Sequence, residues 1–400
     1  MTASQAENII LDGNLLGQLR AEVADVFQVV SVETPRQAPQ GTILFLGNLL
    51  TADSQAAYDI IAQRWQPHDY TPLLRQRNGQ VALIAQPGVV VPKRSNPWLN
   101  LGLAVATIVS VLFSGAMYEC QCVPTTIEDW LGGLPMMLTL MIILLAHEFG
   151  HYFAARYHKV AVTLPYFIPL PAISPVGTLG AFIQLRSPFK TKQQLFDIGI
   201  AGPLAGLVFA IPLLIWGVAT SPVNDLNRST ETASVLEGNS FFYLGVKYLI
   251  HGDVLPSFDE YSDLPFSQEF LLVLVGIVPE GGGNDILINS VAFAAWFGMF
   301  VTAMNLLPVG QLDGGHIIYS LVGDKARYLG IALIGVMLLA GIFWWTGWLV
   351  WALLTFFVIG PNHPPPLNDL VPLNPGRKIL AYATLFIFVI IFMPNPLQAL

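Results

Sequence analysis

Charged residues are scarce in this chain of 400 residues: they make up 11% of it, while hydrophobic residues make up 54%. Because a soluble domain carries roughly 25% charged residues, the composition excludes an ordinary soluble protein and predicts a membrane protein. The scarcity is uneven. Charges are scattered through residues 1–95, whereas almost everything after Trp98 is apolar, so we expect a soluble domain followed by a membrane domain.

Basic residues and cysteines are also few. The 18 Lys and Arg are outnumbered by 26 Asp and Glu, and the net charge of −8 argues against a nucleic-acid partner. Cys120 and Cys122 cannot form a disulfide framework, and a bridge across one intervening residue would be strained. They also lack nearby partners for a metal. The spacing therefore argues against both a bridge and a metal site.

Residues 1–92 carry the signals of a small α+β domain. Residues 41–50 have a β-rich start, and Ser54 can cap the helix that follows. The pair Asn78-Gly79 is a strong two-residue turn signal, which predicts a hairpin around it. The remaining residues, 93–400, form the expected membrane domain.

The membrane domain is expected to cross the bilayer about seven times. A spanning helix needs about 20 apolar residues. The longest apolar run is too long for one crossing and has Gly347 in its middle, so we expect it to form two short helices. The candidate runs are residues 98–117, 133–157, 195–219, 286–308, 328–360 and 379–394.

Basic residues set the expected orientation, because Lys and Arg favour the cytoplasmic side of a membrane. Lys93 and Arg94 precede the first span, the connection 156–192 is basic, and the loop 221–285 is acidic. This pattern predicts a multi-pass protein with its N-terminal domain in the cytoplasm.

Residues 163–185 are apolar but cannot form a straight helix. They contain four prolines together with Gly177 and Gly180, and a helix does not tolerate that density. Irregular backbone at membrane depth survives only against protein or a wet cavity. We interpret the segment as a re-entrant β-like hairpin beside an active site; the alternative is a proline-rich surface connection.

The second expected span contains the sequence HEFGH at residues 147–151. Residues four apart on a helix share one face, so His147 and His151 can reach one zinc ion. Glu148 is placed to take a proton from water that the metal activates. Ionisable side chains inside an apolar helix cost at least a few kcal/mol each, which favours a functional site over the alternative, a buried polar cluster that bridges helices.

A catalytic zinc usually takes three protein ligands, so a third must come from elsewhere in the chain. Asp313 is the only acid between Asp285 and Asp324, and the expected orientation puts it at the depth of the two histidines. His316 is the rival ligand, or a group that orients Asp313. Taken alone, Asp313 could be an ordinary turn residue, since Asp-Gly is a common turn pair.

The fourth expected span ends in a helix-breaking stretch that includes Asn305 and Pro308. An unwound segment exposes backbone groups that could pair with an extended peptide, and the Asn305 amide could hold part of it. The hairpin at 163–185 could supply an edge for strand addition. We therefore expect a substrate to unwind before it is cut.

These motifs resemble those of the site-2 protease family of intramembrane zinc metalloproteases, peptidase family M50. The resemblance covers roughly residues 133–320. It rests on HEFGH at 147–151 and NLLPVGQLDG at 305–314, with SPVGTLGAF at 174–182 and FDIGIAGPLAG at 196–206 in support. Gly47-Asn48-Leu49 and GPNHPPPLND at 360–369 are similar to one subgroup, the chloroplast ethylene-dependent gravitropism-deficient and yellow-green proteins and their cyanobacterial relatives.

The resemblance implies a three-helix catalytic core and a zinc-dependent metalloendopeptidase. Its metal ligands would be His147, His151 and Asp313, with Glu148 as the general base. Residues expected to support the substrate or the metal are Asn305, Pro308, His316 and Gly177.

The resemblance also implies single-span membrane proteins as substrates and an active site toward the cytoplasmic face, in a plasma or thylakoid membrane if the context is cyanobacterial. The N-terminal domain could have a cytoplasmic partner. Two departures from the pattern are Gly206, where many relatives have Asn, and Leu50, where the subgroup tends to have Arg.

A non-proteolytic membrane chaperone or scaffold of the same fold is the main alternative function. The presence of Glu148 weighs against it, because a scaffold has no need of that carboxylate. A metal transporter would spread its ionisable groups along a pathway across the bilayer, whereas here they gather at one depth.

Overall fold

The computed structural model describes residues 13–35, 38–92, 95–225, 235–277, 279 and 283–399. The chain divides into two compact units. Residues 1–93 form the first unit together with two later segments, 186–196 and 364–377, and the second unit contains the rest. Lys93 and Arg94, on which the predicted orientation of the first span rests, lie outside the described residues.

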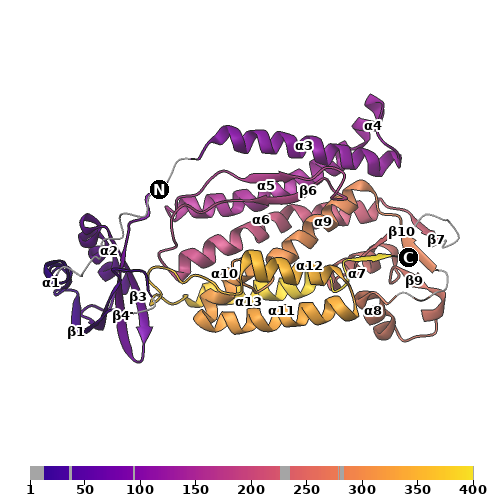
Figure 1. Ribbon diagram of the computed structural model, residues 1–400. Helices are drawn as coiled ribbons and strands as arrows, with labels where there is room; N and C mark the ends of the chain where they lie inside the picture. Colours follow the sequence, from indigo (N-terminus) through magenta and orange to yellow (C-terminus); the bar gives the residue numbers. More distant parts are fainter. Residues whose placement is uncertain are drawn as a thin grey trace. The chain divides into compact units, whose positions relative to one another are not determined.

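The first unit is a four-stranded antiparallel sheet with two helices (Figure 1). The strand order is β1-β2-β4-β3. Its apolar core includes Leu19, Phe45 and Trp65, all fully buried. The elements are α1 (Gly13–Ala21), β1 (Phe27–Glu33), β2 (Ile43–Leu49), α2 (Ser54–Trp65), the 3-10 turn η1 (Gln66–His68), β3 (Tyr70–Arg77) and β4 (Gln80–Pro87).

Local sequence signals explain the boundaries of these elements. Asn78 and Gly79 both have positive φ, at 50° and 83°, as a two-residue type I′ turn requires, and they join β3 to β4 at the expected turn. The cap of α2 is Asp53 rather than Ser54, since Asp53 Oδ1 accepts hydrogen bonds from the backbone N–H groups of Gln55 and Ala56 at 2.9 and 3.1 Å. Ser54 is instead the first helical residue.

Two segments from late in the chain complete the first unit. The Leu367 carbonyl accepts from the Leu74 N–H of β3 at 2.8 Å, and the Asn368 N–H donates to the Lys190 carbonyl at 2.8 Å. The fully buried Asn368 side chain donates through Nδ2 to the Ser54 carbonyl at 3.1 Å. The expected division after residue 92 does not include these segments, because their partners are remote in sequence.

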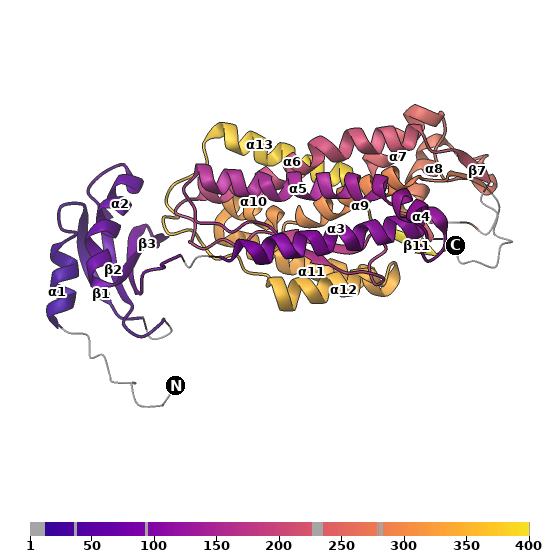
Figure 2. The same ribbon diagram turned by 90° about the horizontal axis from the view of Figure 1, so that it is seen from above.

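The second unit is built from apolar helices, and the axes of the long ones are roughly aligned with one another (Figures 1 and 2). Four helical stretches are long and apolar enough to cross a membrane, at 97–120, 127–157, 192–219 and 313–343. Shorter apolar helices occupy 266–275, 290–305 and 347–359. The total of seven crossings stays a prediction.

The helices of this part are bounded as follows. They are α3 (Pro97–Cys120), α4 (Ile127–Gly132), α5 (Leu134–Tyr157), α6 (Lys192–Ala219), α7 (Phe241–His251), α8 (Phe266–Val275), α9 (Ser290–Asn305), α10 (Asp313–Val322), α11 (Ala326–Phe343), α12 (Gly347–Leu354) and α13 (Pro375–Ile391), with short turns η2 (Asp259–Tyr261) and η3 (Gly323–Lys325) and a π-helical turn η4 (Thr355–Ile359). The run 328–360 is thus divided, with a break between Phe343 and Gly347.

Helix α5 packs against α3 and α9. Glycines allow the close approach. A Cβ at Gly150 of α5 would lie 2.5 Å from the Ala201 carbonyl oxygen of α6, and one at Gly298 of α9 would lie 2.9 Å from Ile143 of α5. Because small residues let helix backbones meet closely, α5, α6 and α9 form a tight three-helix core.

The proline-rich segment 163–185 contains a short antiparallel hairpin. Its strands are β5 (Tyr166–Pro169) and β6 (Thr178–Phe182), with Phe167 opposite Ala181 and an irregularity before Pro169. Helix α3 packs along β5 and also contacts β6. The hairpin therefore lies against the first long helix of the unit.

The region between α6 and α9 contains short strands and a buried cluster of one lysine and two carboxylates. The strands are β7 (Val223–Asp225), β8 (Val235–Glu237), β9 (Ser257–Phe258), β10 (Gly283–Ile286) and β11 (Leu397–Ala399), in the orders β7-β10-β9 and β11-β8. Lys247 of α7 is fully buried, 3.2 Å from both Glu237 and Asp285. Burial raises the pKa of the Asp285 carboxyl to about 6.

The cysteine pair corrects an expectation. The structure joins Cys120 and Cys122 in a disulfide at the end of α3. Gln121 between them adopts a left-handed backbone conformation, with φ of 50°. This conformation brings the two Cα atoms to 5.1 Å, a separation that a disulfide can span, so the spacing argument against a bridge was wrong.

Replacing Asn368 with Leu should loosen the first unit. The change keeps a buried side chain of similar size but removes its hydrogen bonds, so we expect the free energy of unfolding to fall by about 1–3 kcal/mol. Hydrogen exchange of β2, β3 and β4 in the full-length protein should then accelerate about tenfold or more. Gln63→Ala at an exposed position of α2 is the control, and equal protection in both variants would contradict the role of Asn368.

Candidate metal centre

Helix α5 presents His147 and His151 one turn apart, with their ring centroids at 4.9 Å. Both are buried, as is Glu148 between them in sequence. Residues four apart lie on one face of a helix, so the local geometry follows directly from the sequence. The residues of α5 that precede them, from Leu134 to Ala146, are almost all apolar.

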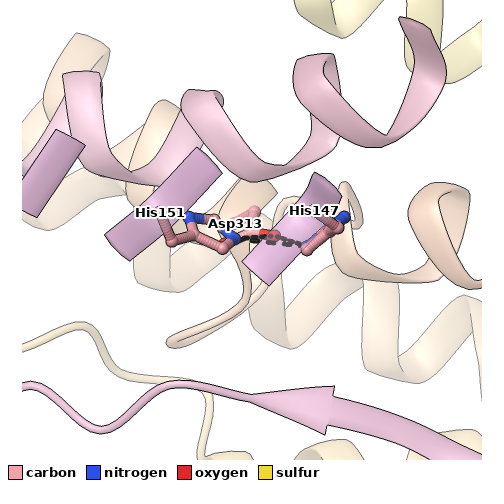
Figure 3. Close-up of side chains that lie close together, drawn as sticks. All are labelled: His147, His151 and Asp313. Atoms are coloured by element: carbon pink, nitrogen blue, oxygen red, sulfur yellow. Dashed lines mark hydrogen bonds and ion pairs between the residues drawn. The ribbon is translucent and has the colours of Figure 1, made fainter. Parts of the chain in front are cut away.

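Asp313 reaches the same point from a break between two helices. Helix α9 ends at Asn305 and α10 begins at Asp313, and the seven residues between them are not part of a helix. The Asp313 Oδ2 atom lies 3.4 Å from His147 Nε2 and 3.3 Å from His151 Nε2. Figure 3 shows the three side chains directed toward one another.

The three donor atoms fit a zinc ion. The two histidine Nε2 atoms are 3.2 Å apart, so all three distances within the group fall between 3.2 and 3.4 Å. Zinc bonds to nitrogen and oxygen of about 2.0–2.1 Å in a tetrahedron put neighbouring ligand atoms about 3.3 Å apart. The arrangement thus has the donor types and the spacing of one face of a tetrahedral site.

The orientation of His151 is fixed by helix α6. His151 Nδ1 lies 2.7 Å from the Ile198 carbonyl oxygen, and a carbonyl can only accept, so Nδ1 carries the proton. The lone pair of the ring is then on Nε2, which faces Asp313 and His147. Such a partner on the second ring nitrogen is typical of metal-binding histidines.

Glu148 lies beside the metal group, as we call His147, His151 and Asp313, in a cavity of about 200 Å³. It is 4% exposed, and its Oε2 atom has no hydrogen-bond partner among the described residues. A buried carboxylate oxygen without a donor is costly, and a catalytic role or a bound ion is among the explanations for one. Its position favours a role as a proton acceptor in the cavity.

The structure separates the four expected support residues into two groups. Asn305 and His316 line the cavity. Asn305 Nδ2 is 3.4 Å from His147 Nε2, and His316 Nδ1 is 2.6 Å from His363 Nε2. Pro308 lies in the break between α9 and α10, and Gly177 lies just before β6; neither is among the cavity-lining residues.

Sequence reasoning expected the hairpin beside the site without naming the residues that line it, and it missed the role of Gly202. Ala181, Phe182 and Ile183 line the cavity from the hairpin side. Gly202 of α6 lies against the His151 imidazole so closely that a Cβ would overlap the ring. The motif FDIGIAGPLAG at 196–206 is similar to a family motif, but nothing in its residue types indicates contact with a histidine of another helix.

Gly206, where many relatives have Asn, also lies next to the candidate metal site. A Cβ at this position would be 3.3 Å from His147 Cβ and 3.4 Å from its Nδ1. The side chain that many relatives carry there would therefore be next to His147 of the candidate metal site.

The model of the family described as Peptidase family M50 matches residues 135–342. Among curated proteins, the probable zinc metalloprotease EGY2, chloroplastic, of Arabidopsis thaliana is 26% identical over 384 residues, 91% of this chain and 62% of that protein. The probable zinc metalloprotease EGY1, chloroplastic, of Oryza sativa subsp. japonica is 28% identical over 262 residues, 65% of this chain and 40% of the relative.

A third relative is the probable zinc metalloprotease EGY3, chloroplastic, of Oryza sativa subsp. indica, 26% identical over 312 residues, 76% of this chain and 50% of the relative. The chain therefore spans less than two thirds of the length of these three proteins. Together with the long apolar helices, the matches identify a membrane protein.

Gly202→Ala should weaken metal binding far more than Gly206→Ala. The new methyl group at residue 202 displaces the His151 ring, so we expect zinc affinity to fall by at least about tenfold. At residue 206 the contact with His147 is looser, and a small adjustment relieves it. Competition with a chelator in the purified full-length protein measures both affinities, and equal values for the two variants would refute this account of the His151 position.

Proposed function

Because the chain belongs to peptidase family M50, we propose that it is a zinc-dependent endopeptidase that cleaves a peptide bond of a membrane protein within the bilayer. One observation carries the proposal: three donor atoms of His147, His151 and Asp313 converge at 3.2–3.4 Å beside the buried Glu148 carboxylate. The printed names of the relatives, probable zinc metalloproteases, support zinc as the metal.

Each residue of the site has a separate role in the proposed hydrolysis of a peptide bond. Zinc, when held by the two histidines and Asp313, supplies a Lewis acid that polarises a peptide carbonyl and makes water more acidic. Glu148 takes the proton of the attacking water and returns it to the leaving amine. The Ile198 carbonyl keeps His151 in the tautomer that leaves Nε2 available for the metal.

Substrate binding is proposed to use the hairpin side of the cavity. A peptide bond in a transmembrane helix has its N–H and C=O groups engaged within the helix, so the substrate must unwind before it is cut. Residues 181 and 182 at the end of β6, and residue 183 after it, line the cavity. An extended peptide could add to this segment as a further strand. The Asn305 amide, also in the cavity wall, could hold the peptide backbone.

The membrane arrangement is proposed from the distribution of basic residues. We infer about seven crossings, with the hairpin re-entrant, the N-terminal unit in the cytoplasm and the active site toward the cytoplasmic face. A plasma or thylakoid membrane would suit a cyanobacterial context. Single-span membrane proteins are the proposed substrates, and the N-terminal unit could bind a cytoplasmic partner.

Glu148→Gln should retain the metal and abolish cleavage. The amide keeps the size of the side chain but cannot accept the proton, so we expect cleavage to fall by about 10²–10⁴-fold with about one zinc still bound. Both quantities are measured in lipid vesicles that contain a panel of single-span membrane proteins.

Asp313→Asn is the companion variant, and it should lose zinc as well as cleavage. Zinc binding by the wild type without any cleavage by it would favour the alternative function, a non-proteolytic chaperone or scaffold of the same fold. A wild type that binds no zinc would remove the metal assignment itself.

A further inference from the structure

Between Asn100 and Ser114, helix α3 carries its polar side chains on its buried side. Asn100, Thr107 and Ser110 are at most 4% exposed, whereas Leu101 and Val109 are 53% and 52% exposed. Hydroxyl and amide groups that face lipid would lose their hydrogen bonds, so a membrane helix turns them toward protein. The buried side of α3 lies along the hairpin, and its polar groups are therefore available to it.

Two of these side chains hold the hairpin at opposite ends. Asn100 Nδ2 donates to the carbonyls of Leu164 and Pro165, at 2.9 and 3.0 Å, just before β5 begins. Ser110 Oγ donates to the Gly177 carbonyl at 2.5 Å, just before β6 begins. Ten residues of helix rise about 15 Å, and five extended residues from Pro165 onward cover about 16 Å, so the spacing of the two donors matches the length of β5.

Gly177 lies in close contact with α3. A Cβ there would overlap the Ser110 carbonyl and lie 2.8 Å from Ser114 Oγ, and its φ of 78° is one that side chains rarely adopt. The Gly177 carbonyl also accepts from the Leu170 N–H at 2.9 Å, which closes the loop of the hairpin. Gly177 therefore acts through contact with α3, away from the cavity.

The position of the hairpin along α3 determines where one part of the cavity wall lies. Strand β6 ends at Phe182, and Ala181, Phe182 and Ile183 line the cavity together with Glu148. Glu148 is carried by α5, which packs against α3 and also contacts β6. A movement of β6 along α3 would thus shift the wall relative to the catalytic carboxylate.

We propose that Asn100 and Ser110 are positioning residues that fix the position of the hairpin along the axis of α3. We further propose that this position selects which peptide bond of a substrate is cut. The selection of the bond rests on the proposed protease function, whereas the fixing of the hairpin does not. Neither residue touches the cavity, so both act through the strand that does.

The first measurement is hydrogen exchange of residues 166–182 in the full-length protein in lipid nanodiscs. Asn100→Leu and Ser110→Ala each remove donors, and exchange should accelerate about tenfold. Ser110→Thr keeps the hydroxyl and should resemble the wild type. Thr107→Val is the matched control: Thr107 is fully buried on the same face, but its hydroxyl has no hydrogen-bond partner among the described residues, so its removal should change exchange less than about twofold.

The second measurement is the position of cleavage. Mass spectrometry of the products from a panel of single-span proteins in vesicles should show new chain ends, displaced by one or more residues, with Asn100→Leu and Ser110→Ala. Zinc content should equal that of the wild type in both variants, which separates a shifted hairpin from a damaged metal centre.

Each outcome bears on a different part of the proposal. Unchanged exchange in both donor variants, or equal acceleration with Thr107→Val, overturns it. Accelerated exchange with unchanged product ends overturns the selection of the bond. If the wild type cleaves no member of the panel, the proposed function fails and the selection of the bond falls with it, while the exchange result still decides whether α3 fixes the hairpin.

Discussion

The approach of the Asp313 carboxylate to two imidazoles in an apolar helix bundle is the interaction on which the rest of the second unit depends. Three lone-pair donors at 3.2–3.4 Å repel one another unless a cation lies among them. A polar group buried in hydrocarbon surroundings must find a partner. The break between α9 and α10 is what allows the carboxylate of one segment to meet the histidines of another.

Small residues make this convergence possible. Gly150 and Gly298 let α6 and α9 approach α5, and Gly202 leaves room for the His151 ring. In a bilayer, close packing rather than the exclusion of water drives helices together, so each missing side chain has a direct effect on the metal group. The same principle applies to Gly177, which lets the hairpin lie against α3.

Several polar side chains of the second unit are turned toward protein and paired there. Asn100 and Ser110 donate to the hairpin, and Lys247 pairs with two carboxylates. The Oε2 atom of Glu148 and the Oδ2 atom of Asp285 are both buried without a hydrogen-bond partner among the described residues. What distinguishes Glu148 is its place beside His147, His151 and Asp313 in the wall of one cavity.

The sequence by itself determined what depends on neighbours along the chain. The spacing of His147 and His151 places both on one face of a helix, the prolines of 163–185 exclude a straight helix, and Asn78-Gly79 fixes a turn, because each follows from local backbone geometry. Only the tertiary structure decided which side chains from other segments meet them. The carbonyl of Ile198, the space at Gly202, the completion of the first unit by Asn368 and the contact of Gly177 with α3 all join residues remote in sequence, and no local pattern encodes a contact made by backbone atoms or by an absent side chain.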